Sequence, residues 1–268
     1  MVGGAWAFGP ALAAAAAVTS RLRVGTLVID NDFRNPAIFA RECATLDVVS
    51  GGRFELGIGA GWNERDYLGI GLPFDRGGVR VDRLAEAVTL LKRLFTEDEV
   101  TFAGRFYKVE RAECRPKAIQ QPHPPIFIAG GGRRILALAG READIVAIIP
   151  RGAGGRGPGL ADVSLERMRD QIAIVREAAG PRFERIELSM FLDCALTDDR
   201  ERTIAEIAER TKGDPAVLRA SAYRGIGTLE QIREHVLRVR DATGVSYFCL
   251  RGPDVERLGP IVAELTGR

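Results

Sequence analysis

One run of the chain has the residue types that bind a phosphate group: Gly130, Gly131, Gly132, Arg133 and Arg134. It follows a short apolar run and precedes a helical pattern. Glycine lets backbone N–H groups approach an anion closely, the first turn of a helix attracts negative charge, and arginine adds charge-assisted hydrogen bonds. The alternative is a tight strand-to-helix turn whose arginines face the solvent.

A second glycine-rich run ends at Trp62. Gly57, Gly59 and Gly61 alternate at the end of an apolar run over residues 54–58. Positions without side chains at the end of a strand leave room for a flat ring. The alternative is close packing of a helix against these glycines.

The stretch from residue 23 to residue 62 predicts a strand, a helix and a second strand. The helix is expected to place Ile38, Cys43, Leu46 and Val49 on one face. A connection of this kind is right-handed and joins parallel strands, and α/β folds bind ligands at the carboxyl ends of such strands. The glycine-rich exit therefore lies where a ligand is expected.

Short apolar strands alternate with helical patterns along the whole chain. Strands are predicted near 23–28, 53–58, 125–129, 144–148, 186–192 and 246–250. Helices are predicted near 10–19, 36–49, 76–95, 132–140, 164–179, 199–210, 228–242 and 253–265. This alternation predicts an α/β fold, either a barrel or an open doubly wound sheet, as one domain over residues 1–268 with an inserted hairpin near 99–109. Six strands are two fewer than a closed barrel of about eight needs.

The composition is that of an ordinary globular protein, with 268 residues, 46% hydrophobic and 28% charged. A net charge of +2 gives no indication of binding to nucleic acid or to a membrane surface. The four cysteines are spaced neither as a zinc site nor as a disulfide framework, so a reducing cytoplasm is the expected setting. His123 and His235 are expected at the surface, and neither is a credible catalytic base.

Several motifs together resemble the bacterial luciferase-like superfamily, and most of all its branch that uses the deazaflavin coenzyme F420. The motifs are Gly25 to Val28, Pro36, Leu46 to Gly57, Gly59 to Asn63, Arg80 to Leu84, Gly130 to Gly132 and Gly140 to Asp144. The resemblance implies a TIM (β/α)8-type barrel with the cofactor across the carboxyl ends of its strands. Family members have a strand, a helix and a strand ahead of the first helix seen here, so the first two strands are expected to be missing.

The resemblance also implies the cofactor site. The expected cofactor-binding residues are Leu27, Val28, Asp30, Gly59, Ala60, Gly61, Gly130, Gly131, Gly132 and Arg133. Leu27 and Val28 align with a non-prolyl cis peptide that would support the ring. Ala60 stands where luciferase itself has an arginine, so a positive charge must come from another residue.

The polar residues beyond both strands have alternative interpretations. Asp30 to Asp32 and Arg34 would hydrogen-bond the edge of the ring, although Asp32 could instead cap the following helix. Trp62 and Asn63 are expected to line the substrate pocket, with packing of Trp62 in the core as the alternative.

The expected function is hydride transfer between F420 and a small organic substrate, in a chain that forms a homodimer. An FMN-dependent monooxygenase is the alternative in the same class. A different alternative is an inactive or truncated barrel fragment, because six strands leave two unpaired edges, and Met1 would then be an internal residue of a longer enzyme. The acid–base residues are not predicted.

Overall fold

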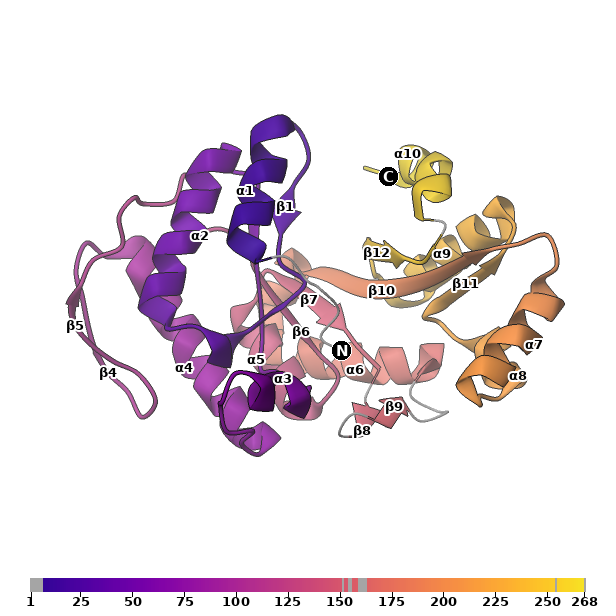
Figure 1. Cartoon of the computed structure of the whole chain (residues 1–268), viewed down its shortest axis with the longest axis horizontal. Helices are drawn as coiled ribbons and strands as arrows, with labels where there is room; N and C mark the ends of the chain where they lie inside the picture. Colours follow the sequence, from indigo (N-terminus) through magenta and orange to yellow (C-terminus); the bar gives the residue numbers. More distant parts are fainter. Residues whose placement is uncertain (1–6, 151, 154–155, 159–162, 254, 268) are drawn as a thin grey trace. The chain divides into compact units, whose positions relative to one another are not determined.

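The computed structural model describes residues 7–150, 152–153, 156–158, 163–253 and 255–267 of the chain. The chain divides into two compact units. The first comprises Met1–Ala129 with Ala137–Ile145, and the second comprises Gly130–Leu136 with Val146–Arg268. Each unit has strands and helices of its own (Figure 1).

Parallel strands form the centre of the first unit. They are β1 (Val24–Gly25), β2 (Ile29–Asp30), β3 (Phe54–Gly59) and β6 (Ile126–Gly130). Both β1 and β2 pair with β3, and β3 pairs with β6, always in parallel. The predicted pair of parallel strands joined by a helix is therefore confirmed. The first predicted strand is interrupted between β1 and β2, where the Leu27–Val28 peptide bond is cis, as the resemblance implied.

The glycines of β3 allow the neighbouring strand to approach closely. A Cβ on Gly57 would overlap the carbonyl oxygen of Thr26, and a Cβ on Gly59 would lie 2.8 Å from Cγ2 of Val28. The Thr26 hydroxyl also donates to the Gly57 carbonyl at 2.6 Å and accepts from the Gly57 N–H at 3.0 Å. The prediction that these glycines leave room for a ring is wrong, because protein atoms fill that space. The alternative of close packing is correct, although the segment that packs against Gly57 and Gly59 is the neighbouring extended segment at Thr26 and Val28 and not a helix.

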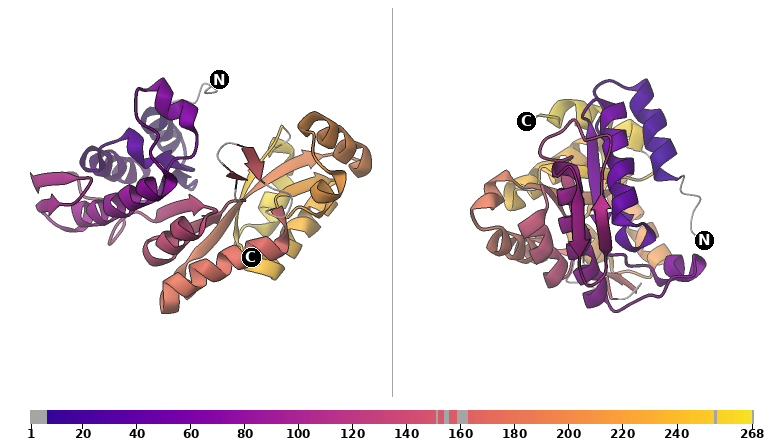
Figure 2. Two further views of the ribbon diagram at one scale, coloured as in Figure 1. Left: turned by 90° about the horizontal axis from the view of Figure 1, so that it is seen from below. Right: turned by 90° about the vertical axis from the view of Figure 1, so that its left-hand side faces the viewer.

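The described residues of the first unit form four complete helices, a short 3-10 helix and part of a fifth helix. The complete helices and the 3-10 helix are α1 (Phe8–Val18), η1 (Asn31–Phe33), α2 (Pro36–Ser50), α3 (Glu64–Gly69) and α4 (Gly77–Thr96). The helix α5 (Arg133–Glu142) is divided between the units, and its residues 137–142 belong to the first. α2 packs against both α1 and α4, which the right-hand view of Figure 2 shows. The helix α3 and η1 were not predicted, because one or two turns carry too little periodicity.

The buried face of α2 differs from the predicted one. Cys43 and Leu46 are buried as expected, but Ile38 and Val49 are 61% and 49% exposed. The residues that α2 buries are Pro36, Phe39, Ala40, Cys43, Ala44, Leu46, Asp47 and Ser50. Apolar residues recur at helical spacing on both sides of this helix, so its tertiary neighbours decide which side is buried.

A hairpin follows α4, as predicted. β4 (Val100–Ala103) and β5 (Lys108–Ala112) pair antiparallel. Glu86 of α4 lies against the turn. Its carboxylate oxygens accept hydrogen bonds from three consecutive backbone N–H groups, those of residues 105–107, at 2.9, 2.8 and 2.5 Å. The hairpin turn is thereby attached to α4.

The second unit also has a parallel arrangement of strands. They are β7 (Ile145–Ile148), β10 (Glu187–Leu196), β11 (Arg224–Gly227) and β12 (Tyr247–Arg251), with a small antiparallel pair, β8 (Gly152–Ala153) and β9 (Arg156–Pro158). β10 neighbours β7 and pairs in parallel with both β11 and β12. β11 was not predicted. Its one large apolar residue, Ile226, packs with Ile204 and Ile207 in the core.

Among the described residues of the second unit, five helices and two 3-10 helices accompany these strands. They are α6 (Leu165–Ala179), η3 (Gly180–Arg185), α7 (Arg200–Thr211), α8 (Pro215–Ala220), α9 (Leu229–Thr243), η4 (Val255–Leu258) and α10 (Gly259–Leu265). Ser164, Asp199 and Thr228 cap the N-termini of α6, α7 and α9 through their side chains, as residues of these types do. The long helices match their predicted positions, and the short α8 was missed.

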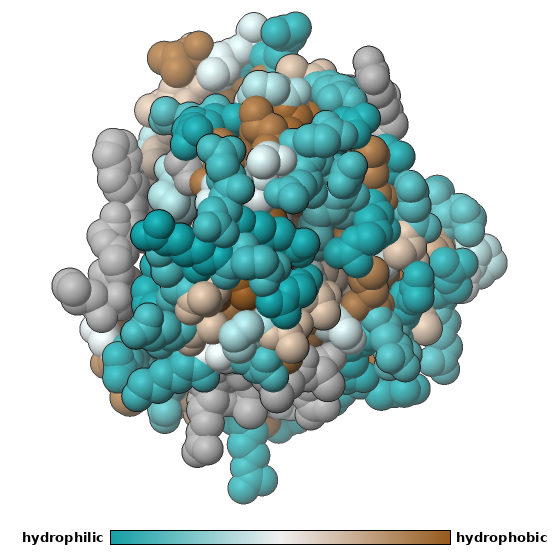
Figure 3. Space-filling view, turned by 90° about the vertical axis from the view of Figure 1, so that its right-hand side faces the viewer, coloured by the Kyte–Doolittle hydropathy of each residue, from teal (hydrophilic) through white to brown (hydrophobic). Residues whose placement is uncertain are grey.

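Figure 3 shows one face of the molecule, on which hydrophilic side chains predominate and hydrophobic ones form small separated groups. Ion pairs such as Arg202–Glu206, 2.9 Å apart on α7, belong to the solvated helix faces of the second unit. Within the described residues, no helix has the length and apolar character needed to cross a membrane.

Candidate functional site

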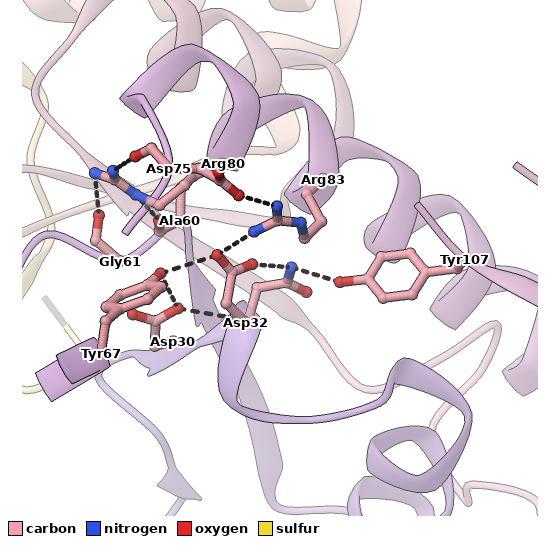
Figure 4. A network of polar contacts seen from close by, with 10 residues as sticks. Asp30, Asp32, Ala60, Gly61, Tyr67, Asp75, Arg80, Arg83 and Tyr107 are labelled. Atoms are coloured by element: carbon pink, nitrogen blue, oxygen red, sulfur yellow. Dashed lines mark hydrogen bonds and ion pairs between the residues drawn. The ribbon is translucent and has the colours of Figure 1, made fainter. Parts of the chain in front are cut away.

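Polar side chains gather where β2 and β3 end, in the first unit (Figure 4). Asp30, the last residue of β2, pairs with Gly59, the last residue of β3. The chain then enters η1, which brings Asp32 close to Asp30. The polar network at this edge consists of Asp30, Asn31, Asp32, Tyr67, Asp75, Arg80, Arg83 and Tyr107. Carboxyl ends of parallel strands are the usual ligand-binding edge of α/β folds.

Tyr67 of α3 lies between two carboxyl groups. Its hydroxyl oxygen is 2.9 Å from Oδ1 of Asp30 and 3.0 Å from Oδ2 of Asp32. The residue is fully buried, and its ring packs edge-on against Phe33 and Phe74, with centroids 5.0 Å apart in both pairs. This packing fixes the position of the hydroxyl between the two acids.

Arg83 of α4 neutralises one of those acids. Its Nη1 lies 2.6 Å from Oδ2 of Asp32, and its Nη2 pairs with Asp75. The Asp32 side chain is only 4% exposed. Removing the arginine would leave a nearly buried carboxylate without a counter-charge, which typically costs about 3–5 kcal/mol.

Arg80, one helical turn earlier, is buried beneath the glycine-rich exit of β3. Its Nε donates to the carbonyl oxygen of Ala60 at 3.0 Å and its Nη2 to that of Gly61 at 3.3 Å, while its Nη1 donates to the Asp75 carbonyl. The guanidinium stacks 3.9 Å from the centroid of Phe74. Arg80 therefore places a positive charge beneath Ala60, where it holds backbone carbonyl groups in position.

The hairpin also reaches this network. Nδ2 of Asn31 donates to the Tyr107 hydroxyl at 2.9 Å and to Oδ1 of Asp32 at 3.2 Å. Asn31 is buried, and burial raises the pKa of Tyr107 to about 12. The Tyr107 hydroxyl is therefore neutral over the physiological pH range.

Burial also controls the protonation of the two groups that meet at the centre. Burial, followed by the negative charge of nearby Asp32, raises the pKa of Asp30, against the lowering effect of the Asp32 backbone N–H and the Tyr67 hydroxyl. Burial and the neighbouring carboxylates raise the pKa of Tyr67 as well. Both groups are held toward their protonated forms.

The glycine run of the second unit precedes α5. Gln171 of α6 is buried, and its Nε2 donates to the carbonyl oxygens of Gly131 and Ile149, both at 2.9 Å. A Cβ on Gly132 would have no described atom within 4 Å, so the space there is open. Arg133 forms an exposed ion pair with Glu177 at 3.6 Å.

A family model described as luciferase-like monooxygenase matches residues 9–246. The chain belongs to this luciferase-like family. The resemblance inferred from the sequence is thereby confirmed.

Two curated relatives differ in the cofactor that their names give. The luciferase-like chain is 40% identical over 136 residues to an F420-dependent glucose-6-phosphate dehydrogenase of Intrasporangium calvum, covering 50% of the chain and 40% of that relative. It is 28% identical over 213 residues to an FMNH2-dependent dimethylsulfone monooxygenase of Pseudomonas putida, covering 79% of the chain and 54% of that relative. The chain thus spans about half the length of these relatives, or less.

A solved structure supports the fold. The luciferase-like chain matches an F420-dependent secondary alcohol dehydrogenase, solved with an F420-acetone adduct, with a TM-score of 0.77 and 21% identity. The match covers 96% of the chain and 82% of that structure. The α/β fold of TIM-barrel type expected from the sequence is therefore confirmed.

The predicted substrate-pocket residues lie just beyond β3 of the luciferase-like chain. Trp62 is 73% exposed, so its alternative placement in the core is wrong. The side chain of Asn63 caps α3 by accepting the N–H of Arg65 at 3.3 Å. The cap of α2 is Asn35 rather than Asp32, whose carboxylate is engaged by Arg83.

Both histidines lie deeper than predicted. The side chain of His123 is 11% exposed and 4.0 Å from Asp144. Nε2 of His235 is 2.9 Å from the Ala222 carbonyl oxygen, and burial lowers the pKa of His235. Both side chains are therefore less exposed than predicted, although neither residue is fully buried.

Sequence reasoning missed most of the polar network. The missed residues are Tyr67, Asp75, Arg80, Arg83 and Tyr107. One usable signal was present: Arg80 and Arg83 are three residues apart, so they lie on one face of the long helix. In the sequence, the motif Arg80 to Leu84 indicates the family but does not by itself show which groups its two arginines contact.

Proposed function

We propose that this chain is an oxidoreductase that moves a hydride between coenzyme F420 and a small organic substrate. The observation that carries the proposal is the 40% identity over 136 residues to an enzyme named as F420-dependent. The substrate is proposed only as a class, because the chain spans 40% of that relative.

The glycine run fits the phosphate of such a cofactor. The first turn of α5 contains no acidic residue, and Arg133 and Arg134 lie in it. The open space at Gly132 lets an anion approach backbone N–H groups at the start of the helix. Gln171 holds the loop through the Gly131 carbonyl, which leaves the N–H side of the loop available. Gly130 to Arg133 are therefore the proposed phosphate-binding residues.

The strand ends of the first unit fit a flat ring. Leu27 is 43% exposed and Trp62 is 73% exposed, and apolar surface at the carboxyl ends of strands suits an aromatic cofactor. We expect Leu27 and Val28 to support the ring and Asp30 to hydrogen-bond its edge. The other proposed contacts are the backbone of Gly59, Ala60 and Gly61 for the cofactor, and Trp62 and Asn63 for the substrate.

The residues of the chain hold the strand ends against which the cofactor ring is proposed to bind. When bound, F420 accepts or gives a hydride at a ring carbon, and that chemistry belongs to the cofactor. Arg80 fixes the carbonyl groups of Ala60 and Gly61, and Arg83 fixes Asp32. The strand ends are thereby held rigidly, as precise placement of a ring requires.

A titration with F420, with FMN in parallel, tests the proposal through absorbance and fluorescence. We expect saturable binding of F420 that is tighter than binding of FMN. Gly132→Asp places a negative charge in the open space beside the predicted phosphate. It should weaken F420 binding by about tenfold or more, which corresponds to about 1.4 kcal/mol.

Gly259→Asp is the matched control. Gly259 is also at the start of a helix, α10, and a Cβ there would likewise have no described atom within 4 Å. We expect this variant to bind F420 as the wild type does. Equal weakening by both variants would contradict a phosphate site at Gly132.

An FMN-dependent monooxygenase is the second candidate. The similarity to the Pseudomonas putida enzyme, named as FMNH2-dependent, favours it. Tighter binding of FMN than of F420 in the same titration would select this candidate. Binding of neither cofactor would favour an inactive fragment.

We also propose that the chain forms a homodimer in the cytoplasm and does not bind nucleic acid. Ile38, Val48 and Val49 of α2 are 61%, 42% and 49% exposed, and exposed apolar side chains on one helix suit a protein interface. The near balance of 38 basic and 36 acidic residues supports the absence of nucleic-acid binding.

A further inference from the structure

The hydroxyl of Tyr67 has one proton and two carboxyl neighbours. It lies 2.9 Å from Oδ1 of Asp30 and 3.0 Å from Oδ2 of Asp32, and both are hydrogen-bond distances. A tyrosine hydroxyl has a single hydrogen, and an ionised carboxylate only accepts. If both acids were ionised, one of them would face the hydroxyl oxygen with no hydrogen between them. One further proton, held by either acid, satisfies both contacts.

The partners of the two acids decide which one holds that proton. Oδ2 of Asp32 pairs with Arg83 at 2.6 Å, and its Oδ1 accepts from Asn31 at 3.2 Å. A proton on Asp32 would weaken the ion pair. Oδ1 of Asp30 accepts the Asp32 backbone N–H at 3.0 Å, and no arginine or lysine in the described part of the chain bonds to its carboxyl group. The proton therefore belongs on Asp30, which can donate to Tyr67 while Tyr67 donates to Asp32.

Charged and titratable groups from several elements surround Asp30. These groups are Asp32 of η1, Tyr67 of α3, Asp75 before α4, Arg80 and Arg83 of α4, and Tyr107 of the hairpin, which reaches Asp32 through Asn31. Arg83 pairs with two carboxylates, and Arg80 bonds only to backbone carbonyl oxygens. Burial raises the pKa of Asp30 and acts in the same direction as this arrangement, whereas the positive charge of Arg80 lowers this pKa by a smaller amount.

We propose that Asp30 is a protonated carboxylic acid at neutral pH and that it gives its proton to the substrate when the substrate is reduced. Asp30 is the last residue of β2, beside Gly59 and two residues beyond Val28. The role in reduction rests on the proposed function; the protonation state does not.

The substrate class that fits is a carbonyl or imine compound. A bound reduced deazaflavin would supply the hydride, with its two electrons, to the substrate carbon. The carboxyl O–H of Asp30 turns from the Tyr67 hydroxyl to the bound substrate. This O–H bond then breaks, and its proton forms the new O–H or N–H bond of the product. The Asp30 carboxylate then regains a proton from water, with Tyr67 as its hydrogen-bond partner.

Carboxyl carbon NMR of the cofactor-free protein, labelled with ¹³C at aspartate, tests the protonation state. The signal of Asp30 is identified by its absence in Asp30→Asn. We expect it at the chemical shift of a protonated carboxyl at about pH 7. A signal of an ionised carboxylate at about pH 7 would overturn the proposal.

The pH dependence of stability gives a second readout. A folded-state pKa above the unfolded value of 3.8 means that the folded protein holds a proton that the unfolded chain has lost. The wild type should therefore lose stability as pH rises from 3.8 through the folded pKa. Asn stays neutral, so the stability of Asp30→Asn relative to wild type should rise over this window.

Asp98→Asn is the matched control for both experiments, because Asp98 is exposed in the same unit. Its stability should follow the wild type at every pH. A curve for Asp30→Asn that runs parallel to the wild type would also overturn the protonated state.

Activity tests the role in reduction. The amide of Asp30→Asn can still hydrogen-bond the ring edge, so this variant should retain saturable F420 binding. It should reduce carbonyl substrates about 100-fold more slowly or worse, as expected for loss of a general acid. Asp98→Asn should keep full activity. Full activity in Asp30→Asn would overturn the acid role. If the wild type does not bind F420, the proposed function fails, and the NMR and stability results still decide the protonation of Asp30.

Discussion

Gly61 has the most constrained position among the residues of the site. Its φ is +71°, a conformation that other residues rarely adopt. A Cβ there would overlap the carboxylate of Asp30 and the hydroxyl of Tyr67, while the Gly61 carbonyl accepts from Arg80. The side chains of Asp30, Tyr67 and Arg80 therefore all lie against Gly61. Only glycine adopts this backbone angle readily and leaves space for these side chains.

Gly61→Ala should accordingly lower the free energy of unfolding by about 1–3 kcal/mol, because the backbone is strained and Tyr67 must move away from Asp30. Urea unfolding followed by fluorescence measures this change. Gly132→Ala is the control, since a Cβ there has open space and φ is not in the left-handed region. Equal stability of Gly61→Ala and wild type would contradict the close packing at Gly61.

Among the elements, α4 connects three parts of the first unit. Arg80, Arg83 and Glu86 recur at a spacing of three residues and so lie on neighbouring positions of one helix face. Arg80 reaches the end of β3, Arg83 reaches η1, and Glu86 reaches the hairpin turn. One helix thereby fixes the relative positions of the strand ends and the hairpin within this unit.

Glu86→Ala should release the hairpin turn. Three backbone N–H groups, those of residues 105–107, would lose their acceptor. Their amide hydrogen exchange should accelerate by about tenfold or more, because each lost bond contributes about 1 kcal/mol. Hydrogen exchange followed by NMR measures the effect.

Glu99→Ala provides the comparison within the same hairpin. Glu99 pairs with Arg111 at 3.0 Å at an exposed position, and exposed pairs contribute little. Similar acceleration in both variants would mean that Glu86 does not hold the turn.

At the scale of the whole molecule, the exposed apolar residues of α2 are the expected dimer contact. Ile38→Asp should shift the protein from dimer to monomer, because a charge in an apolar interface loses its hydration without a partner. Light scattering after size-exclusion chromatography measures the mass. Val262→Asp, on α10 and 48% exposed, is the control and should stay dimeric. A monomeric wild type would contradict the proposed dimer.

Local periodicity and resemblance to a family determined much of this protein from its sequence. The long helices, four of the strands at nearly their full length, part of β10, the hairpin, the cis peptide at Leu27–Val28 and the family itself were all predicted. These features depend on residues near one another in the chain, or on motifs that a family repeats. Short elements such as β11 and α8 were missed, because four to six residues carry too few periods to detect.

Only the tertiary structure decided what lies against each residue. The sequence predicted that the glycines of β3 leave room for a ring, with close packing as the alternative, but the strand that ends at Asp30 occupies the space. Both faces of α2 carry apolar residues, and its helical neighbours determine which one is buried. Tyr67 and Arg83 meet Asp32 from positions 35 and 51 residues away, a distance over which periodicity carries no information. Close packing and charge pairing join segments that are distant in the sequence. The residues that make up the site could therefore be identified only from the tertiary structure.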